Sequence, residues 1–378
     1  MTLDNLYTPC LILDKNILST NIERMNAQAK KLGVSLRPHV KTSKSVQVAL
    51  MIGDGAIGPI TVSTLREAEY FADAGFKDII YAVSIVPEKL SRVVDLLNRD
   101  VDLKMIIDDV DVAKEINAYG ERFKRTFCIL IEIDVDMHRA GLSPTSPEVI
   151  KIAKVLNEGV GTKFCGVLTH AGESYECENE QELVEAAENE RNAIVEAADN
   201  IRRAGIHCDI VSCGSTPTAT HAKDLSGVTE LRAGVYVFQD LFQAGRGSCE
   251  KNFDLALSVL TTVISHKKNQ NRIITDAGGM ALSKDQSTKG TEFDCGYGLV
   301  ADIEGKIIEN LFVNGANQEH GIITTQNGKS FDFNQFPIGT KLRILPNHAC
   351  MTAAAYDKYH VIDGNDKIIA RWGRCNGW

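Results

Sequence analysis

The sequence lacks the cysteine pattern of a disulfide-stapled or zinc-ribbon protein. Its ten cysteines are scattered over 378 residues without a single Cys-x-x-Cys pair. Small secreted frameworks and all-cysteine zinc sites need closely spaced pairs. The scatter argues against both classes, and we expect most of these thiols to be reduced, small, buried side chains.

Long apolar runs and blocks of like charge are also missing. Nowhere do eighteen apolar residues follow one another, and residues 1–14 lack the basic start and apolar stretch of a signal peptide. We therefore expect a cytoplasmic protein with no membrane span. Lys and Arg number 41 against 50 Asp and Glu, a net charge of −9, and neither sign is clustered. Nucleic acid and anionic membranes are thus not expected partners.

What the sequence does contain is a regular alternation of strand-like and helical segments. Eight strand-like runs are separated by eight helical patterns, at a period of roughly 25–30 residues that suits βα units. The expected strands are Val34–Lys41, Pro59–Ser63, Asp78–Ser84, Asp102–Asp108, Phe127–Asp134, Phe164–His170, Cys208–Cys213 and Thr229–Tyr236. Several runs are almost wholly apolar, as in covered parallel sheets. Eight consecutive units without a Gly-x-Gly-x-x-Gly turn favour a (β/α)8 TIM barrel over a doubly wound α/β sheet.

The rhythm changes near Lys251, where short strands alternate with Gly, Asn and Asp turns. This pattern is typical of a separate β domain. We predict a barrel over residues 15–250 and a β domain over residues 251–378, which the N-terminal strand of residues 1–14 can join. Within the barrel, Gly75, Gly120 and Gly205 fall where helices should stop.

Lys41 stands at the end of the first expected barrel strand. Pro38 excludes a helix there, and Val40 closes the strand just before Lys41. The carboxyl edge of barrel strands is where catalysis takes place, and a lysine at that edge can form a Schiff base with a carbonyl cofactor. A solvated surface lysine is the ordinary alternative, and the polar groups at other strand ends weigh against it.

Three other strand ends carry polar groups that can converge with Lys41. The sixth strand leads to His170 and Tyr175, and the eighth leads into Arg232–Tyr236. After the seventh strand come Gly214, Ser215 and Thr216, which offer hydroxyls at a helix N-terminus. Such a turn can bind phosphate or simply cap the helix.

A lysine and a phosphate cradle on one rim suggest pyridoxal phosphate (PLP), since loops after the last two strands commonly bind phosphate in this fold.

The expected β domain has two polar clusters of its own. His348 and Cys350 are two residues apart, so on an extended segment both would face one side and could share a metal. A merely structural pair is the alternative. Glu319 and His320 follow a strand and could orient a ligand or cap a turn.

Six short motifs, taken together and in order, resemble the D-serine dehydratase-like family of PLP enzymes. They are RPHVKTSK (37–44), TVST (61–64), LTHAG (168–172), GSTPT (214–218), RAGVYVF (232–238) and PNHAC (346–350). The likeness runs from Thr8-Pro9 to Gly377-Trp378. It implies an alanine-racemase-like fold, a barrel plus a β domain, in a homodimer with the active site near the subunit interface.

The resemblance also implies roles for individual residues. Lys41 would carry PLP and abstract the Cα proton, and Tyr175 would meet the pyridine nitrogen. Independently of the resemblance, Arg139 stands just after the fifth expected strand and could pair with a carboxylate or the cofactor's phenolic oxygen, or form a surface salt bridge. The residues expected around PLP are Lys41, Arg139, His170, Tyr175, Gly214, Ser215, Thr216 and Tyr236. His348 and Cys350 match the family's metal-binding pair.

The implied reaction is dehydration of a D-3-hydroxy amino acid. The preferred substrate would be D-threo-3-hydroxyaspartate, giving oxaloacetate and ammonia, with D-serine giving pyruvate and ammonia. A divalent metal on the hydroxyl would help it leave, and the Cys350 thiolate suits zinc, with manganese or cobalt as other choices. The alternatives are D-threonine aldolase, whose members tend to have aspartate in place of Cys350, and a non-catalytic PLP-binding barrel, which would need neither a second domain nor the metal pair.

Overall fold

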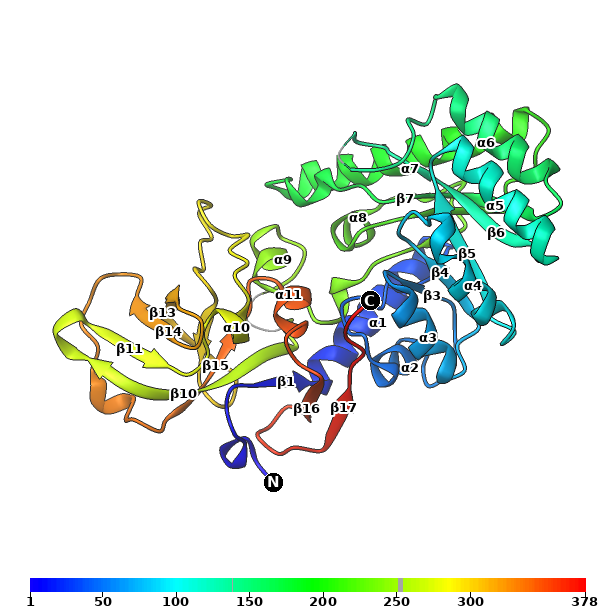
Figure 1. The fold of residues 1–378 in the computed structure, drawn as a ribbon. Helices are drawn as coiled ribbons and strands as arrows, with labels where there is room; N and C mark the ends of the chain where they lie inside the picture. Colours follow the sequence, from blue (N-terminus) through cyan, green and yellow to red (C-terminus); the bar gives the residue numbers. More distant parts are fainter. Residues whose placement is uncertain (138, 251–253) are drawn as a thin grey trace. The chain divides into compact units, whose positions relative to one another are not determined.

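A computed structural model describes residues 1–137, 139–250 and 254–378 (Figure 1). The chain divides into two compact units. One comprises Arg24–Gly234 with Cys375–Trp378 and is called the barrel unit below; the other comprises Met1–Glu23 with Val235–Arg374 and is called the β unit. The boundary expected at Lys251 falls outside the described residues. No described helix has the length and apolar character needed to cross a membrane.

Eight parallel strands form the sheet of the barrel unit, in the order β2-β9-β8-β7-β6-β5-β4-β3. They are β2 (Ser35–Leu36), β3 (Ile60–Val62), β4 (Asp78–Tyr81), β5 (Asp102–Ile107), β6 (Phe127–Ile133), β7 (Thr162–Thr169), β8 (Ile210–Cys213) and β9 (Glu230–Leu231). A parallel bridge between His39 and Thr61 joins the two ends of this order. The ring of strands is therefore closed, and the predicted barrel is confirmed.

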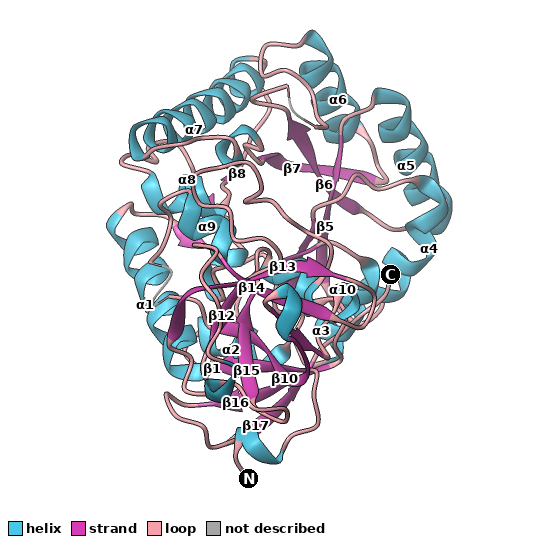
Figure 2. Ribbon diagram, turned by 90° about the vertical axis from the view of Figure 1, so that its left-hand side faces the viewer, coloured by secondary structure: helices cyan, strands magenta, loops and turns pink. Residues whose placement is uncertain are grey.

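Helices cover the outer face of this ring. The helices that alternate with the strands are α2 (Val46–Ile52), α3 (Leu65–Asp73), α4 (Leu90–Leu97), α5 (Val110–Phe123), α6 (Pro147–Glu158), α7 (Glu180–Arg203) and α8 (Thr216–His221). The helix α1 (Lys15–Lys31) precedes the first strand, and its residues are divided between the two units. Figure 2 shows α4, α5, α6 and α7 beside the strands, and each packs against one or two of them. Because the sheet is largely buried, most residues of its strands are apolar.

Several details differ from the sequence-based expectation. The eighth strand, expected to reach Tyr236, ends at Leu231, and Val235–Val237 form a 3-10 helix. The first strand is short, because Pro38 has no N–H to donate and interrupts the ladder between β2 and the His39 bridge. The expected helix stop at Gly120 is wrong, since α5 continues to Phe123 and ends at Lys124 in the left-handed conformation. Gly120 serves close packing instead: a Cβ there would lie 2.3 Å from the carbonyl oxygen of Gly161.

The β unit contains a nine-stranded, mainly antiparallel sheet in the order β11-β14-β13-β12-β15-β10-β1-β16-β17. Its strands are β1 (Cys10–Asp14), β10 (Leu257–Lys267), β11 (Arg272–Thr275), β12 (Leu299–Ala301), β13 (Ile307–Ala316), β14 (Gly321–Thr325), β15 (Lys341–Leu345), β16 (Lys358–Ile362) and β17 (Ala370–Gly373). Its short helices are α9 (Leu241–Gly245), α10 (Gly279–Leu282) and α11 (Ala349–Ala353). The last two strands were not expected from the sequence.

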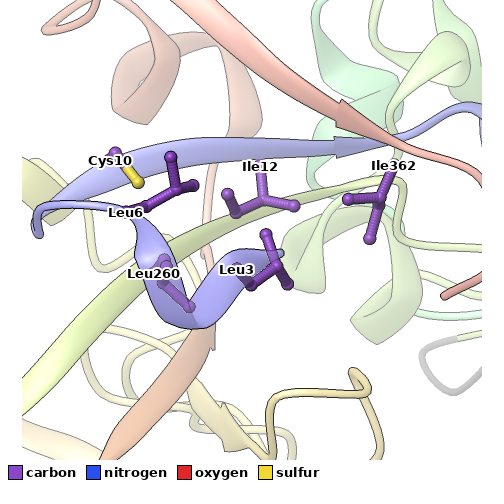
Figure 3. Close-up of a cluster of buried hydrophobic side chains, with 6 residues drawn as sticks. All are labelled: Leu3, Leu6, Cys10, Ile12, Leu260 and Ile362. Carbon is purple, nitrogen blue, oxygen red and sulfur yellow. The ribbon is translucent and has the colours of Figure 1, made fainter. Parts of the chain in front are cut away.

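The N-terminal strand belongs to this second sheet. β1 pairs antiparallel with β10 and parallel with β16. Figure 3 shows the apolar cluster that anchors it, formed by Leu3, Leu6, Cys10, Ile12, Leu260 and Ile362. Residues from the start, the middle and the end of the chain thus share one core.

Replacing Gly120 tests the close packing of α5. Alanine normally stabilises a helix interior by about 1 kcal/mol relative to glycine. Here we expect Gly120→Ala to lower the free energy of unfolding by about 1–3 kcal/mol, because the new Cβ meets fixed backbone atoms. Urea unfolding measures the change. Gly373→Ala is the control, since nothing lies within 4 Å of its Cβ position; equal stability of the two variants would contradict the argument.

Candidate active site

Lys41 follows the bridge that closes the barrel. The backbone N–H of Val40 donates to the carbonyl of Thr61 at 2.9 Å, and Thr61 donates back to Pro38 at 2.9 Å. These two bonds fix the segment that leads into Lys41 at the carboxyl edge of the strands. The positive charge of Lys41 is felt by two histidines of the same unit, His39 and His170, which places all three near one another.

His170 lies just beyond β7. Its Nδ1 is 3.2 Å from the carbonyl oxygen of Gly214, and its ring lies 5.9 Å from that of Tyr175. Burial, reinforced by the charge of Lys41, lowers the pKa of His170 to about 3. The ring is therefore neutral at pH 7, and its single proton must sit on Nδ1 to donate to Gly214.

His39 is the second neutral histidine of this edge. Burial holds its pKa well below the usual value, and the charges of Lys41, Arg232 and His170 act in the same direction. Its Nε2 lies 3.4 Å from the hydroxyl of Ser63. The two histidines that feel the charge of Lys41 thus both stay uncharged at neutral pH.

The turn after β8 has the features of an anion cradle. Gly214 has φ +125°, and a Cβ there would lie 2.3 Å from the carbonyl oxygen of Arg232, so only glycine fits. Ser215 caps α8: its Oγ accepts the N–H of Thr218 at 3.2 Å, and its own N–H donates to the Thr218 hydroxyl at 2.9 Å. Thr216 is almost completely buried. The bare backbone of Gly214 and the buried hydroxyls suit a phosphate group.

Two arginines lie at other strand ends. Arg232 is buried and donates to the Ser212 hydroxyl at 2.7 Å and to the Thr169 carbonyl, which ties β7, β8 and β9 together. Arg139 lies 3.6 Å from Glu132. The pair is not an ordinary surface salt bridge. The Arg139 side chain is exposed, whereas Glu132 is buried and burial raises its pKa.

The predicted PLP residues fall in both units. Lys41, Arg139, His170, Tyr175, Gly214, Ser215 and Thr216 belong to the barrel unit. Tyr236 belongs to the β unit, where it is buried within a short 3-10 helix.

His348 and Cys350 belong to the β unit. The expectation that they share an extended segment is wrong: His348 precedes α11, and Cys350 lies in its first turn. The helical turn still brings the imidazole and the thiol within hydrogen-bonding reach. His348 Nδ1 also lies 2.9 Å from a carboxylate oxygen of Asp285. Burial lowers the pKa of His348, but its bonds to Asp285 and Cys350 outweigh burial and raise that pKa to about 11.

Buried polar residues hold this turn in place. Asp240 accepts the N–H of Ala349 at 2.9 Å with one carboxylate oxygen and the N–H of Gln243 at 2.9 Å with the other. Asn347 accepts the Thr288 hydroxyl at 2.7 Å. The residue between the two candidate ligands is thus fixed by its backbone.

The donor chemistry of this turn suits a zinc-type cation. An imidazole nitrogen and a thiolate are zinc ligands. Across residues 1–137, 139–250 and 254–378, no three His, Cys, Asp or Glu side chains are grouped as a metal site. His348 and Cys350 therefore supply at most two ligands.

Glu319 and His320 are exposed on the hairpin turn between β13 and β14.

The structure adds three carboxylates that the sequence analysis did not identify. Asp240 and Asp285 are far in sequence from the turn they support, and no motif links them to it. Glu190 is different, because it interrupts the apolar stripe of α7. A charged residue in such a stripe is a signal that the helical periodicity of the sequence contains.

Comparison with known proteins agrees with this architecture. Residues 13–241 match the alanine racemase N-terminal domain, and residues 256–362 match the putative serine dehydratase domain. Over its whole length the chain is 46% identical to D-threo-3-hydroxyaspartate dehydratase of Delftia sp. (strain HT23), of which 99% is covered. It is 31% identical to D-serine dehydratase of Dictyostelium discoideum, over all of this chain and 98% of that one.

A solved structure of D-threo-3-hydroxyaspartate dehydratase, a cysteine-to-alanine mutant in the metal-free form, is similar along the entire chain. The two share a TM-score of 0.97 and 45% identity, with full coverage of both chains. The chain therefore belongs to the D-serine dehydratase-like family of PLP enzymes, which joins an alanine racemase N-terminal domain to a serine dehydratase domain.

Proposed function

We propose that the protein is a PLP-dependent lyase that dehydrates D-3-hydroxy amino acids. The observation that carries this proposal is the 46% identity to a D-threo-3-hydroxyaspartate dehydratase over all of this chain and 99% of that one. The preferred reaction converts D-threo-3-hydroxyaspartate into oxaloacetate and ammonia. D-Serine, the substrate named for another relative, would give pyruvate and ammonia.

The polar edge of the barrel supports this chemistry. PLP, when bound, withdraws electrons from the substrate's Cα and makes its proton acidic. The Lys41 amine would hold the cofactor and then take that proton. Gly214, Ser215 and Thr216 would hold the phosphate, and Tyr175 would face the ring nitrogen. Tyr236 is included because the resemblance implies it, and Arg139 because it stands just after the fifth barrel strand, β6.

The neutrality of His39 and His170 suits a lysine that must act as a base. A proton on either ring would put a second positive charge close to Lys41. Burial and Lys41 itself disfavour that proton. The arrangement thus adds no imidazolium charge beside Lys41 at neutral pH.

We also propose that His348 and Cys350 bind a divalent metal, with zinc preferred over manganese or cobalt. Such a metal supplies a Lewis acid for the departing hydroxyl. Asp285 already engages Nδ1 of His348, which leaves Nε2 as the ligand atom. A homodimeric assembly and a cytoplasmic location complete the proposal.

The first experiment is a product assay with D-threo-3-hydroxyaspartate, D-serine and D-threonine, before and after EDTA treatment. We expect oxaloacetate from the first and pyruvate from the second, both lost with chelation and restored by zinc, manganese or cobalt. Oxo-acid release that survives complete metal removal would refute the metal's part. Glycine and acetaldehyde from D-threonine, without oxo acid from any substrate, would reassign the protein as an aldolase.

Replacing Lys41 tests its two roles. We expect Lys41→Ala to lose the yellow colour of lysine-bound PLP and to lower turnover at least about a hundredfold, because the base is gone. After borohydride reduction of the wild type, peptide mass spectrometry should find PLP on Lys41. Lys114→Ala is the control, since Lys114 is exposed on α5 and forms a surface ion pair with Asp111. Full turnover in Lys41→Ala would contradict the mechanism.

His170 predicts a pH dependence of stability. An unfolded histidine takes up its proton near pH 6.5, whereas folded His170 does so only near pH 3. Unfolding therefore gains a proton between these values, and stability falls as the pH falls, by at most about 1.4 kcal/mol per pH unit. Urea unfolding between pH 7 and pH 4 should show a shallower loss for His170→Gln. The exposed His207→Gln variant is the control, and an unchanged slope in His170→Gln would refute the assignment.

A further inference from the structure

A buried glutamate stands in the apolar stripe of α7. The other buried residues of this face are Leu183, Ala186, Ala187, Ile194, Ala197, Ala198 and Ile201. Glu190 lies among them with only 2% of its surface exposed. A carboxyl group in such a place loses much of its hydration, so it persists only where it makes strong hydrogen bonds.

One oxygen of Glu190 joins two turns of the barrel edge. Its Oε1 accepts the backbone N–H of Ala171 at 2.9 Å and that of Gly214 at 3.0 Å. Ala171 follows His170 beyond β7, and Gly214 opens the phosphate cradle directly after β8. A single atom therefore holds together the turn that carries His170 and the turn proposed to hold phosphate.

The same two turns are joined again by side chains. The Ser174 hydroxyl donates to the carbonyl of Ala171 at 2.8 Å and lies 2.9 Å from the Ser215 hydroxyl. Ser215 in turn lies 3.0 Å from the hydroxyl of Thr218, which also bonds to Glu190. These contacts form a closed ring that starts and ends at Glu190.

We propose that Glu190 is a positioning residue that sets the affinity of the protein for PLP through the backbone of Ala171 and Gly214. The inference rests on the proposed function, in which Gly214, Ser215 and Thr216 hold the cofactor's phosphate. Without an acceptor at this position, two buried N–H groups lose their partner and the turns after β7 and β8 separate. The helix itself would remain, since its apolar stripe would only become more complete.

Two substitutions of Glu190 distinguish the effect of its hydrogen-bond acceptor from the effect of its negative charge. Glu190→Gln keeps a carbonyl oxygen that can accept both N–H groups, whereas Glu190→Leu fits the apolar stripe and accepts neither. Titration of apo-protein with PLP, followed by visible absorbance, measures the dissociation constant. We expect Glu190→Leu to raise it by about tenfold to a hundredfold, and Glu190→Gln to stay within about threefold of wild type.

Hydrogen exchange in the apo-protein gives a readout that does not depend on the cofactor. Peptides containing Ala171 and Gly214 should exchange faster in Glu190→Leu than in Glu190→Gln. Wild-type affinity in Glu190→Leu would overturn the inference, as would an equal loss in both variants. Failure of the wild type to bind PLP would refute the proposed function instead. Should Glu190→Leu not fold, Ser174→Ala removes another link of the ring and should weaken PLP binding several-fold; unchanged affinity would overturn the inference.

Discussion

The bridge between His39 and Thr61 is the interaction on which the barrel edge depends. It joins the last strand in the sheet order to the first, so the ring closes at this point. The bridge also fixes the backbone two residues before Lys41. The same backbone contact thus closes the barrel and positions Lys41, the candidate base. Although β2 has only two residues, the RPHVKTSK motif that follows it therefore has a structural role.

Closure also determines the electrostatics of the edge. His39, His170 and Arg232 all come from residues at or beyond strand ends, and in a closed ring these ends face one another. For all three, burial is the first cause that lowers the pKa. The two histidines therefore stay neutral. Arg232 keeps its charge, and its guanidinium donates hydrogen bonds to the Ser212 hydroxyl and the Thr169 carbonyl. Arg232 therefore has a structural role, and Lys41 remains the candidate base.

The sequence predicted the parts that local patterns encode. Eight βα periods predicted the barrel. Turn residues next to apolar runs predicted that Lys41, His170 and Gly214 follow strand ends, where the structure has them. Patterns failed where distant contacts decide: Gly120 was taken for a helix stop, although its small size serves the packing against Gly161. The spacing of His348 and Cys350 predicted an extended segment, which is wrong, because α11 begins directly after His348. The N–H of its first residue, Ala349, is held by Asp240, more than a hundred positions earlier in the chain.

Buried carboxylates perform the same task in both units. Glu190 holds the N–H groups of Ala171 and Gly214, and Asp240 holds that of Ala349, the residue between His348 and Cys350. In each case the carboxylate accepts hydrogen bonds from backbone N–H groups at or next to a candidate functional residue, and does not bond to the side chain of that residue. Only a change to proline removes a backbone N–H, so such a contact constrains the turn while leaving its side chains free to change. A turn held in this way can keep its shape while its side chains are exchanged, because the N–H groups that the carboxylates accept belong to the backbone.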